Sequence, residues 1–399
     1  MRIPLALAFA GLLAFSPTAA LAADNIQNPS VKPPAPIYVA VPGRPFGVAM
    51  SHDGHWIFVA ILGGREGKSG VALIRNDNGR FALERTADLG DGPAGIVLTH
   101  DGKNLIGAMG DSVLVLDTGR LISGEPKPVI AKIKDGDQAG SIYVNVTADD
   151  KLLFVSNEGA ATISVIDLER VRTHGFDARA VIGRIPVGLA PIALTFSPDG
   201  RWLYTTCEEA SPKWNWPATL KPEDAGPEQA NMRVPAGAVV VVDVARARTD
   251  PAHSVIARVP AGSSPVRMAI SPDGGRIYVT ARGENALLVF DTAKLRSDPD
   301  HALLARETVG AAPVPVAVIQ EGKTVVVGNS NRFNRSSKAE TLMVLDAARL
   351  GPAVIGTIPC GSFPREMCVS GDGKTLCVTN FGSSTLEIID AQNPPIGRE

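Results

Sequence analysis

The chain repeats one phrase seven times at a nearly constant interval. Each copy has a Gly/Pro approach, an apolar strand, an Asp-Gly turn or its equivalent, and a second apolar strand. A polar loop and a third strand, which mostly ends at Asp, follow. The intervals between successive turn acids are 48, 48, 50, 74, 48 and 51 residues. The turn acids are Asp53, Asp101, Asp149, Asp199, Asp273, Glu321 and Asp372. A fixed period of this length predicts an architecture of stacked structural repeats.

The repeat predicts an all-β fold. Third strands such as Val239–Asp243 are short, rich in β-branched residues and bounded by turn residues, which is typical of strands rather than helices. A fourth strand precedes most Gly/Pro approaches, as at Val255–Val259. Four antiparallel strands per repeat, seven times over, predict a seven-bladed β-propeller across residues 37–391. Radial stacking would bury both apolar faces of each blade.

The two ends of the repeat array predict how the ring closes. The seventh repeat has no fourth strand, and Pro394 and Pro395 lie soon after its third strand, so residues 392–399 are expected to form a C-terminal tail. At the other end, Ile37–Val41 reads as a strand without a blade. We expect this N-terminal strand to complete the seventh blade. A ring closed in this way needs no partner to bury its core, so a monomer is expected.

One long insertion accounts for the 74-residue interval. It spans residues 207–237 in blade four and contains Trp214 and Trp216, in a chain with only 5% aromatic residues. Such a pair in a polar loop is consistent with a lid or a binding wall. We favour the other interpretation, in which the tryptophans anchor the loop to the propeller surface.

The antiparallel order of the strands collects most charged loop residues on one face. The Asp-Gly turns lie on the opposite face. The charged loops surround the start of each innermost strand, at the mouth of the central channel. Function in such folds usually resides in loops on a rigid frame. The candidate ligand-binding residues at the mouth are Arg44, Glu158, Glu208, Glu209, Trp214, Trp216, Arg267, Arg282, Arg365 and Asn380.

The chemistry of these candidates leaves several alternatives open. Convergent arginines could hold a carboxylate or phosphate, or they could instead pair with nearby Glu66, Glu284 or Glu366. The glutamates could act as general acids or bases, and with Asn side chains they could bind Ca²⁺. No cofactor is predicted apart from that Ca²⁺ alternative. No metal ligand and no catalytic residue is assigned, and whether the chain is an enzyme stays open.

Several catalytic signatures are missing from the sequence. There is no G-x-S-x-G, H-E-x-x-H or P-loop motif, and no histidine falls at the expected channel mouth. There is also no C-x-x-C-H motif, so covalently attached c-type haem is not supported.

The first residues resemble a secretory signal. A basic start, an apolar stretch and the Ala20-Leu-Ala22 cleavage site predict a signal peptide over residues 1–22, followed by a linker over residues 23–36. No later segment has 18 unbroken apolar residues, so no membrane span is expected and the mature chain should be periplasmic or secreted. Without Arg2, the 39 basic residues fall to 38 against 41 acidic ones. A net charge of −3 makes nucleic acid an unfavourable partner.

The four cysteines are too few for a disulfide scaffold in a chain of this length. Cys368 and Cys377 flank one turn of blade seven. A three-residue loop at Gly371–Gly373 would place Cys377 opposite Met367 and send the two sulfurs to opposite faces. A four-residue loop would bring them together. We favour the three-residue loop and expect no bridge.

The repeat resembles that of the YVTN-repeat β-propellers, which include YncE-like periplasmic proteins. The residues that carry the resemblance are Gly188-x-x-Pro191, Ser197-Pro-Asp-Gly200, Leu203-Tyr204, and Ile277-Tyr-Val-Thr280 with the strand that follows it. The resemblance covers the mature chain and implies a seven-bladed propeller. For function it implies a scaffold that binds a small molecule or a protein at the channel mouth. Related propellers suggest two alternatives: a lactonase-like hydrolase of a small cyclic ester, and an accessory subunit of a quinoprotein-type redox system. No catalytic residue is carried over.

Overall fold

The computed structural model describes residues 33–63, 69–174, 178–216, 218–220, 232–333, 340–349, 351 and 353–397. The predicted signal peptide at 1–22, most of the predicted linker at 23–36, much of the blade-four insertion and Glu66 lie outside the described residues. None of the helices in the described part of the chain has the length and apolar character that crossing a bilayer requires.

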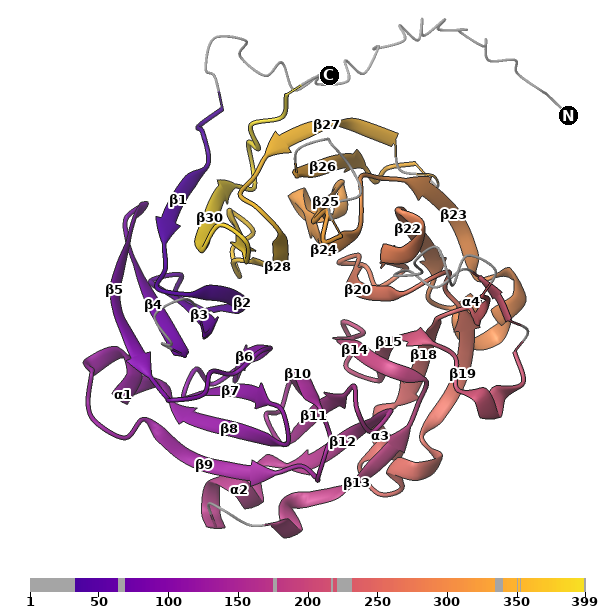
Figure 1. The fold of residues 1–399 in the computed structure, drawn as a ribbon, viewed down its shortest axis with the longest axis horizontal. Helices are drawn as coiled ribbons and strands as arrows, with labels where there is room; N and C mark the ends of the chain where they lie inside the picture. The colour runs from indigo at the N-terminus through magenta and orange to yellow at the C-terminus, as the bar shows by residue number, and fades with distance from the viewer. Residues whose placement is uncertain are drawn as a thin grey trace, which may run out of the picture. The chain divides into compact units, whose positions relative to one another are not determined.

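Seven antiparallel sheets of four strands form a ring, which confirms the predicted seven-bladed β-propeller (Figure 1). Blade one contains β2 (Arg44–Met50), β3 (Trp56–Leu62), β4 (Gly70–Asp77) and β5 (Arg80–Asp88). Blade two contains β6 (Ile96–Leu98), β7 (Asn104–Met109), β8 (Ser112–Asp117) and β9 (Val129–Lys134). Blade three contains β10 (Ser141–Val146), β11 (Leu152–Asn157), β12 (Thr162–Asp167) and β13 (Val181–Pro186).

The remaining blades follow the same order from the centre outward. Blade four contains β14 (Leu189–Phe196), β15 (Trp202–Glu209), β18 (Ala238–Asp243) and β19 (Val255–Pro260), and its insertion adds the hairpin β16 (Ala218–Leu220) and β17 (Val234–Pro235). Blade five contains β20 (Pro265–Ile270), β21 (Arg276–Ala281), β22 (Ala286–Asp291) and β23 (Leu303–Thr308). Blade six contains β24 (Pro313–Ile319), β25 (Thr324–Asn329), β26 (Thr341–Asp346) and β27 (Ala353–Pro359). Short helices connect outer strands: α1 (Thr118–Ser123), α2 (Leu168–His174), α3 (Val244–Ala247) and α4 (Lys294–Ser297).

Blade seven joins the two ends of the chain. It contains β28 (Pro364–Val369), β29 (Thr375–Asn380), β30 (Thr385–Asp390) and, as its outermost strand, β1 (Ile37–Ala40). β1 pairs antiparallel with β30, with Ile37 opposite Ile388, so the N-terminal strand closes the ring as predicted. Beyond blade seven, Gly397 exchanges two backbone hydrogen bonds with Thr357 on β27, which attaches the predicted tail to blade six.

The Asp-Gly motifs are turns with local hydrogen bonds. In blade four the Asp199 carboxylate accepts hydrogen bonds from the Ser197 hydroxyl and, at 3.1 Å, from the backbone N–H of Arg201. The hydrogen bond from Ser197 is the main cause that lowers the pKa of Asp199. Gly200 has φ +68°, a left-handed conformation that glycine adopts without strain. These turn residues therefore build the face opposite the channel mouth.

The blade-seven hairpin corrects one prediction. Cys377 lies directly opposite Cys368, and Met367 lies opposite Val378, so the predicted pairing of Cys377 with Met367 is wrong. The reason is the loop length. The backbone N–H of Ser370 donates to the carbonyl oxygen of Thr375 at 2.9 Å, which leaves four residues in the loop rather than three. The extra residue shifts the register by one and places both thiols on the same face.

Candidate functional site

The inner strands present their side chains at the mouth through a repeated irregularity. The ladders between the first two strands are interrupted near the start of the inner strand, for example between Ser141 and Tyr143 in blade three and between Pro364 and Glu366 in blade seven. The equivalent ladders of blades one, four, five and six are interrupted there too. A bulge of this kind re-aims side chains and leaves a backbone N–H without its ladder partner.

A hydroxyl on the second strand binds that N–H and also joins adjacent blades. Thr379 Oγ1 accepts from the Glu366 N–H at 3.0 Å and donates to the Phe46 carbonyl oxygen, in blade one, at 2.8 Å. Thr280 accepts from the Arg267 N–H at 3.2 Å and donates to the Val314 carbonyl oxygen at 2.8 Å. Thr206 repeats the arrangement in blade four. We call these three residues, Thr206, Thr280 and Thr379, the threonine clips.

Aromatic and charged side chains from five blades meet where these bulges point. We call them the channel-mouth cluster. Its aromatic part links blades one, three and seven: Phe46 lies 5.8 Å from Tyr143 and 6.4 Å from Phe381, and Phe363 lies 5.3 Å from Phe381, between ring centroids. The members of the cluster are Phe46, Tyr143, Glu158, Glu208, Arg267, Arg282, Phe363, Arg365, Glu366 and Phe381.

Two of the arginines are held by carboxylates. Buried Arg267 donates from Nε to Glu366 Oε2 at 3.1 Å, between blades five and seven, and its guanidinium lies 3.9 Å from the Tyr143 ring centroid. Buried Arg282 donates from Nη2 to both oxygens of Glu208 at 3.1 Å. Pairing with Glu366, one of the alternatives considered from the sequence, is therefore realised by Arg267. Glu284 lies elsewhere, where it pairs with Arg306.

Arg365 differs from the other two. Its guanidinium lies 4.0 Å from the Phe46 ring centroid and also faces Phe363 and Phe381, at 5.7 and 5.9 Å. Its buried Nε has no hydrogen-bond partner, and no carboxylate of the described residues pairs with it. Burial, and then the charge of Arg282, lowers the pKa of Arg365 to about 10, so the side chain stays positive at neutral pH.

Glu158 is the matching unpaired acid. Among the described residues no group donates a hydrogen bond to its carboxylate. Desolvation, and then the negative charge of Glu208, raises the pKa of Glu158, whereas the charges of Arg365, Arg282 and Arg332 oppose the shift. Within the described part of the cluster, Arg365 therefore has no carboxylate partner, and Glu158 is a carboxyl group whose pKa is raised.

The remaining candidates lie at the edge of this cluster or away from it. Arg44 lies 5.5 Å from the Phe381 ring centroid, and Glu209 ends β15 next to Glu208. Asn380 is fully buried inside blade seven, where its Nδ2 donates to Glu387 Oε2 at 2.9 Å. Its role there is to satisfy a buried carboxylate, not to face the mouth.

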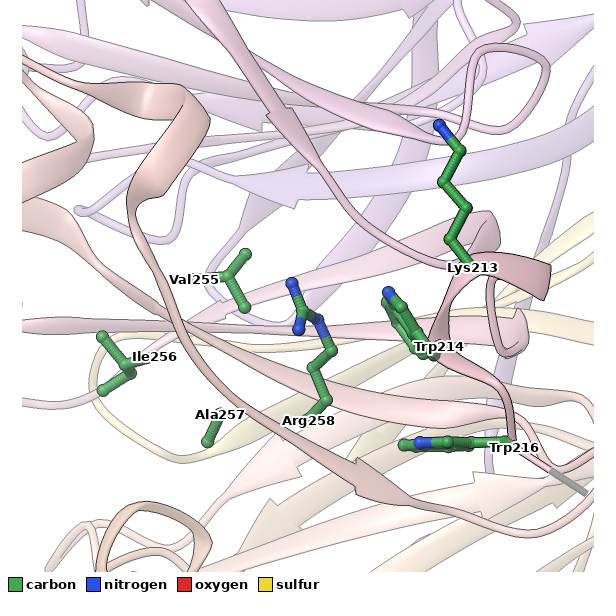
Figure 2. Close-up of a pocket in the computed structure, with 7 residues that line it drawn as sticks. All are labelled: Lys213, Trp214, Trp216, Val255, Ile256, Ala257 and Arg258. Carbon is green, nitrogen blue, oxygen red and sulfur yellow. The ribbon is translucent and has the colours of Figure 1, made fainter.

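The two tryptophans also lie outside the cluster. Trp214 and Trp216 lie 5.3 Å apart, between ring centroids, and line a pocket against β19, the outermost strand of blade four (Figure 2). The Arg258 guanidinium lies 5.0 Å from the Trp214 ring, and both tryptophans pack against the apolar core between blades three and four. This placement matches the surface-anchor alternative, because the partly buried rings pack against the core and hold the described start of the insertion to the blade.

The Ca²⁺ alternative has no support from the geometry. No group of three His, Cys, Asp or Glu side chains that could hold a metal ion occurs within the described residues. Glu208 and Glu366 already bind guanidinium groups, which occupy the oxygens that a cation would need.

Comparison with known proteins shows the fold and no family. No family model and no curated protein matches this chain in sequence. Among solved structures, hydrazine synthase of Kuenenia stuttgartiensis is similar with a TM-score of 0.52 and 19% identity, covering 89% of this chain and 86% of that one. A chain of the mitotic checkpoint complex is similar with a TM-score of 0.64 and 13% identity, covering 96% of this chain and 99% of that one. At such identities the likeness extends to the propeller architecture alone.

Proposed function

We propose that this chain is an exported, YncE-like propeller that binds a small organic anion at the channel mouth, with Arg365 as the principal contact. The observation that carries the proposal is a charged guanidinium that lies against an aromatic ring and has no carboxylate partner among the described residues. Arg267 and Arg282 show that this site does provide carboxylates to guanidinium groups. Arg365 is left without one in the same surroundings.

The surroundings favour a carboxylate with a flat apolar part. A buried polar group without a partner costs about 1–3 kcal/mol, and more when it is charged, so a ligand that supplies two acceptor oxygens would remove that cost. Carboxylates bind guanidinium groups through paired, charge-assisted hydrogen bonds. Phe46, Phe363 and Phe381 provide apolar surface beside the same group.

Titration calorimetry with a panel of small carboxylates, each matched to its neutral amide, tests the proposal. We expect aromatic carboxylates to bind and their amides not to. Arg365→Gln should weaken binding roughly 10- to 100-fold, since a hydrogen bond to a charged group contributes about 1.5–3 kcal/mol. Arg248→Gln is the matched control, because Arg248 pairs with Asp149 at 3.3 Å on the exposed turn face. Equal affinity of wild type and Arg365→Gln for every bound carboxylate would exclude this site.

Glu158 supports a second candidate, the hydrolysis of a small cyclic ester. A desolvated carboxyl with a raised pKa beside positive charge has the properties of a general acid or base. In that reaction the Glu158 carboxylate would accept a proton from the attacking water and return it to the alkoxide oxygen of the opened ring. Arg365 would bind the carboxylate of the hydroxy acid product. A lactone panel decides between the two: turnover that Glu158→Gln abolishes would establish hydrolysis, whereas carboxylate binding without turnover of any lactone would leave binding alone.

Export is part of the proposal and has its own test. It rests on residues 1–22, whose basic start, apolar stretch and Ala-x-Ala site resemble a signal peptide. The full chain expressed in a Gram-negative host should appear in the periplasmic fraction with a new N-terminus at residue 23 or 24. Full-length protein that stays in the cytoplasm would contradict it.

A further inference from the structure

Two cysteines of blade seven face each other across the first two strands of the blade. Cys368 on β28 and Cys377 on β29 are directly opposite each other in the strand ladder. Cys377 is fully buried, whereas Cys368 is only partly buried. Both belong to the apolar cluster between blades seven and one. All four cysteines are free thiols in this structure.

The ladder determines the backbone spacing of the pair. Hydrogen-bonded pairs alternate along an antiparallel ladder, and Ser370 N–H donates to Thr375 O. Cys368 and Cys377 each lie two positions farther from the turn than Ser370 and Thr375, so they too form a hydrogen-bonded pair. The Cα atoms of such a pair lie about 5.5 Å apart, within the range of about 4.4–6.8 Å that a disulfide spans. The backbone therefore permits a bridge without a change of register.

A bridge at this position would be easy to reduce. Facing Cβ atoms of a hydrogen-bonded pair are farther apart than the roughly 3.5–4.5 Å that a relaxed disulfide prefers, so the strands must draw together when the bond forms. Strained disulfides have higher reduction potentials and belong to the labile class.

We propose that Cys368 and Cys377 are a redox-responsive dithiol that forms an intrachain disulfide by exchange with a small disulfide oxidant. The thiolate of the more accessible Cys368 attacks the oxidant, which releases one thiol and leaves a mixed disulfide on Cys368. The Cys377 thiolate then attacks the Cys368 sulfur and releases the second thiol. The protein loses two electrons and two protons, and the oxidant disulfide gains them as two thiols.

The pair differs from the other two cysteines in having a cysteine directly opposite. A raised thiol pKa is not the difference, since the neighbouring Cys368 and then burial also raise the pKa of Cys377. The buried Cys207 sulfur accepts a hydrogen bond from the Gly188 N–H at 3.2 Å, and burial raises its pKa to about 12. Cys360 lies near the buried Glu387, and burial raises its pKa as well. Neither is paired with another cysteine in any strand register. The proposal is independent of the anion site, although β28 also carries Arg365.

The tryptic map gives a direct test on the full chain. The purified protein is equilibrated in redox buffers with a range of reduced-to-oxidised glutathione ratios, quenched in acid, alkylated under denaturing conditions and digested. Lys374 lies between the two cysteines, so cleavage there separates a peptide starting at Glu366 from one starting at Thr375. We expect these two peptides to become disulfide-linked as the oxidised fraction rises, with two of the four thiols lost to alkylation.

Single variants distinguish the pair from non-specific oxidation. Cys360→Ser should leave the linked peptide unchanged, whereas Cys368→Ser should abolish it and leave Cys377 fully alkylated. Four alkylated cysteines across the whole glutathione range would overturn the proposal. So would a link that forms only between two copies of the chain on a non-reducing gel.

Discussion

Thr379→Val tests the interface between blades seven and one, where the ring closes beside the channel-mouth cluster. Valine keeps the shape of threonine but has no hydroxyl, so the variant removes one group that makes two buried hydrogen bonds. The Glu366 N–H loses its acceptor at 3.0 Å, and the Phe46 carbonyl oxygen loses a donor at 2.8 Å. Both groups lie at the interface of blades seven and one, where Thr379 itself is fully buried.

The expected loss follows from these two orphaned groups. Each buried group left unsatisfied costs about 1–3 kcal/mol. Two such groups together give an expected loss of about 2–6 kcal/mol in the free energy of unfolding. Thr379→Ser is the matched control: it keeps the hydroxyl and loses one methyl group, which costs about 1 kcal/mol.

Urea unfolding followed by tryptophan fluorescence measures the difference. Thr379→Val should unfold at a clearly lower urea concentration than Thr379→Ser. It should also weaken anion binding, because the two backbone groups belong to cluster residues. If valine is as stable as threonine, or if serine is as destabilising as valine, the hydroxyl is not what joins the blades and the reasoning fails.

Three further predictions concern the rest of blade seven and the insertion. Desolvation raises the folded-state pKa of Glu387. The stability that this carboxyl contributes is present below its ordinary pKa and is lost as pH rises through the raised value. Glu387→Gln should therefore gain stability relative to wild type as pH increases from about 4 to 7, which thermal melts at each pH would measure. A chain that starts at residue 42 lacks β1 and leaves β30 as an open edge, so it should aggregate in size-exclusion runs, whereas a chain that starts at residue 33 should stay monomeric. Trp214→Ala should loosen the insertion, seen as faster proteolysis there, while the affinity for carboxylates stays within about twofold because the ring lies against β19 and not at the mouth.

The fold was predictable because the repeat determines it several times over. Each copy shows the same strand lengths and the same turn, so a prediction that is ambiguous in one copy can be decided from the other six. The closing strand at Ile37 was predictable for the same reason: the seventh copy lacked a partner strand that the N-terminus supplied. By contrast, the hairpin register at Cys377 was predicted wrongly, because the position at which the strand pairing ends sets the loop length and the strand pattern does not show it. The same four-residue loop occurs in other blades, for example between Ser197 and Trp202.

The site was predictable only as a set of charges. Arg267, Arg282, Arg365, Glu158 and Glu208 do gather. Glu158, Glu208 and Arg282 each follow the paired end of the second strand in their blades, whereas Arg267 and Arg365 lie at adjoining positions of the inner-strand bulge. Which of them pair could not be predicted from the sequence, since the paired residues belong to different blades and lie 74 and 99 residues apart in the chain. The aromatic members, such as Phe46, were missed. The available signal was an aromatic residue within two positions of the proline that begins an inner strand, as at Phe363.

The repeated threonines connect the architecture to the site more closely than the charges do. Thr280 in the Tyr-Val-Thr phrase, like Thr379 two blades later, accepts a hydrogen bond from a backbone N–H of the inner strand. That N–H lacks a ladder partner because the inner strand bulges there. That bulge is also what turns Arg267 and Arg365 toward the mouth. A residue that reads in sequence as a β-branched strand former therefore stabilises the backbone irregularity on which the cluster depends. Substituting any threonine clip by valine should accordingly lower stability and anion affinity together, whereas a substitution in the core between blades should lower stability alone.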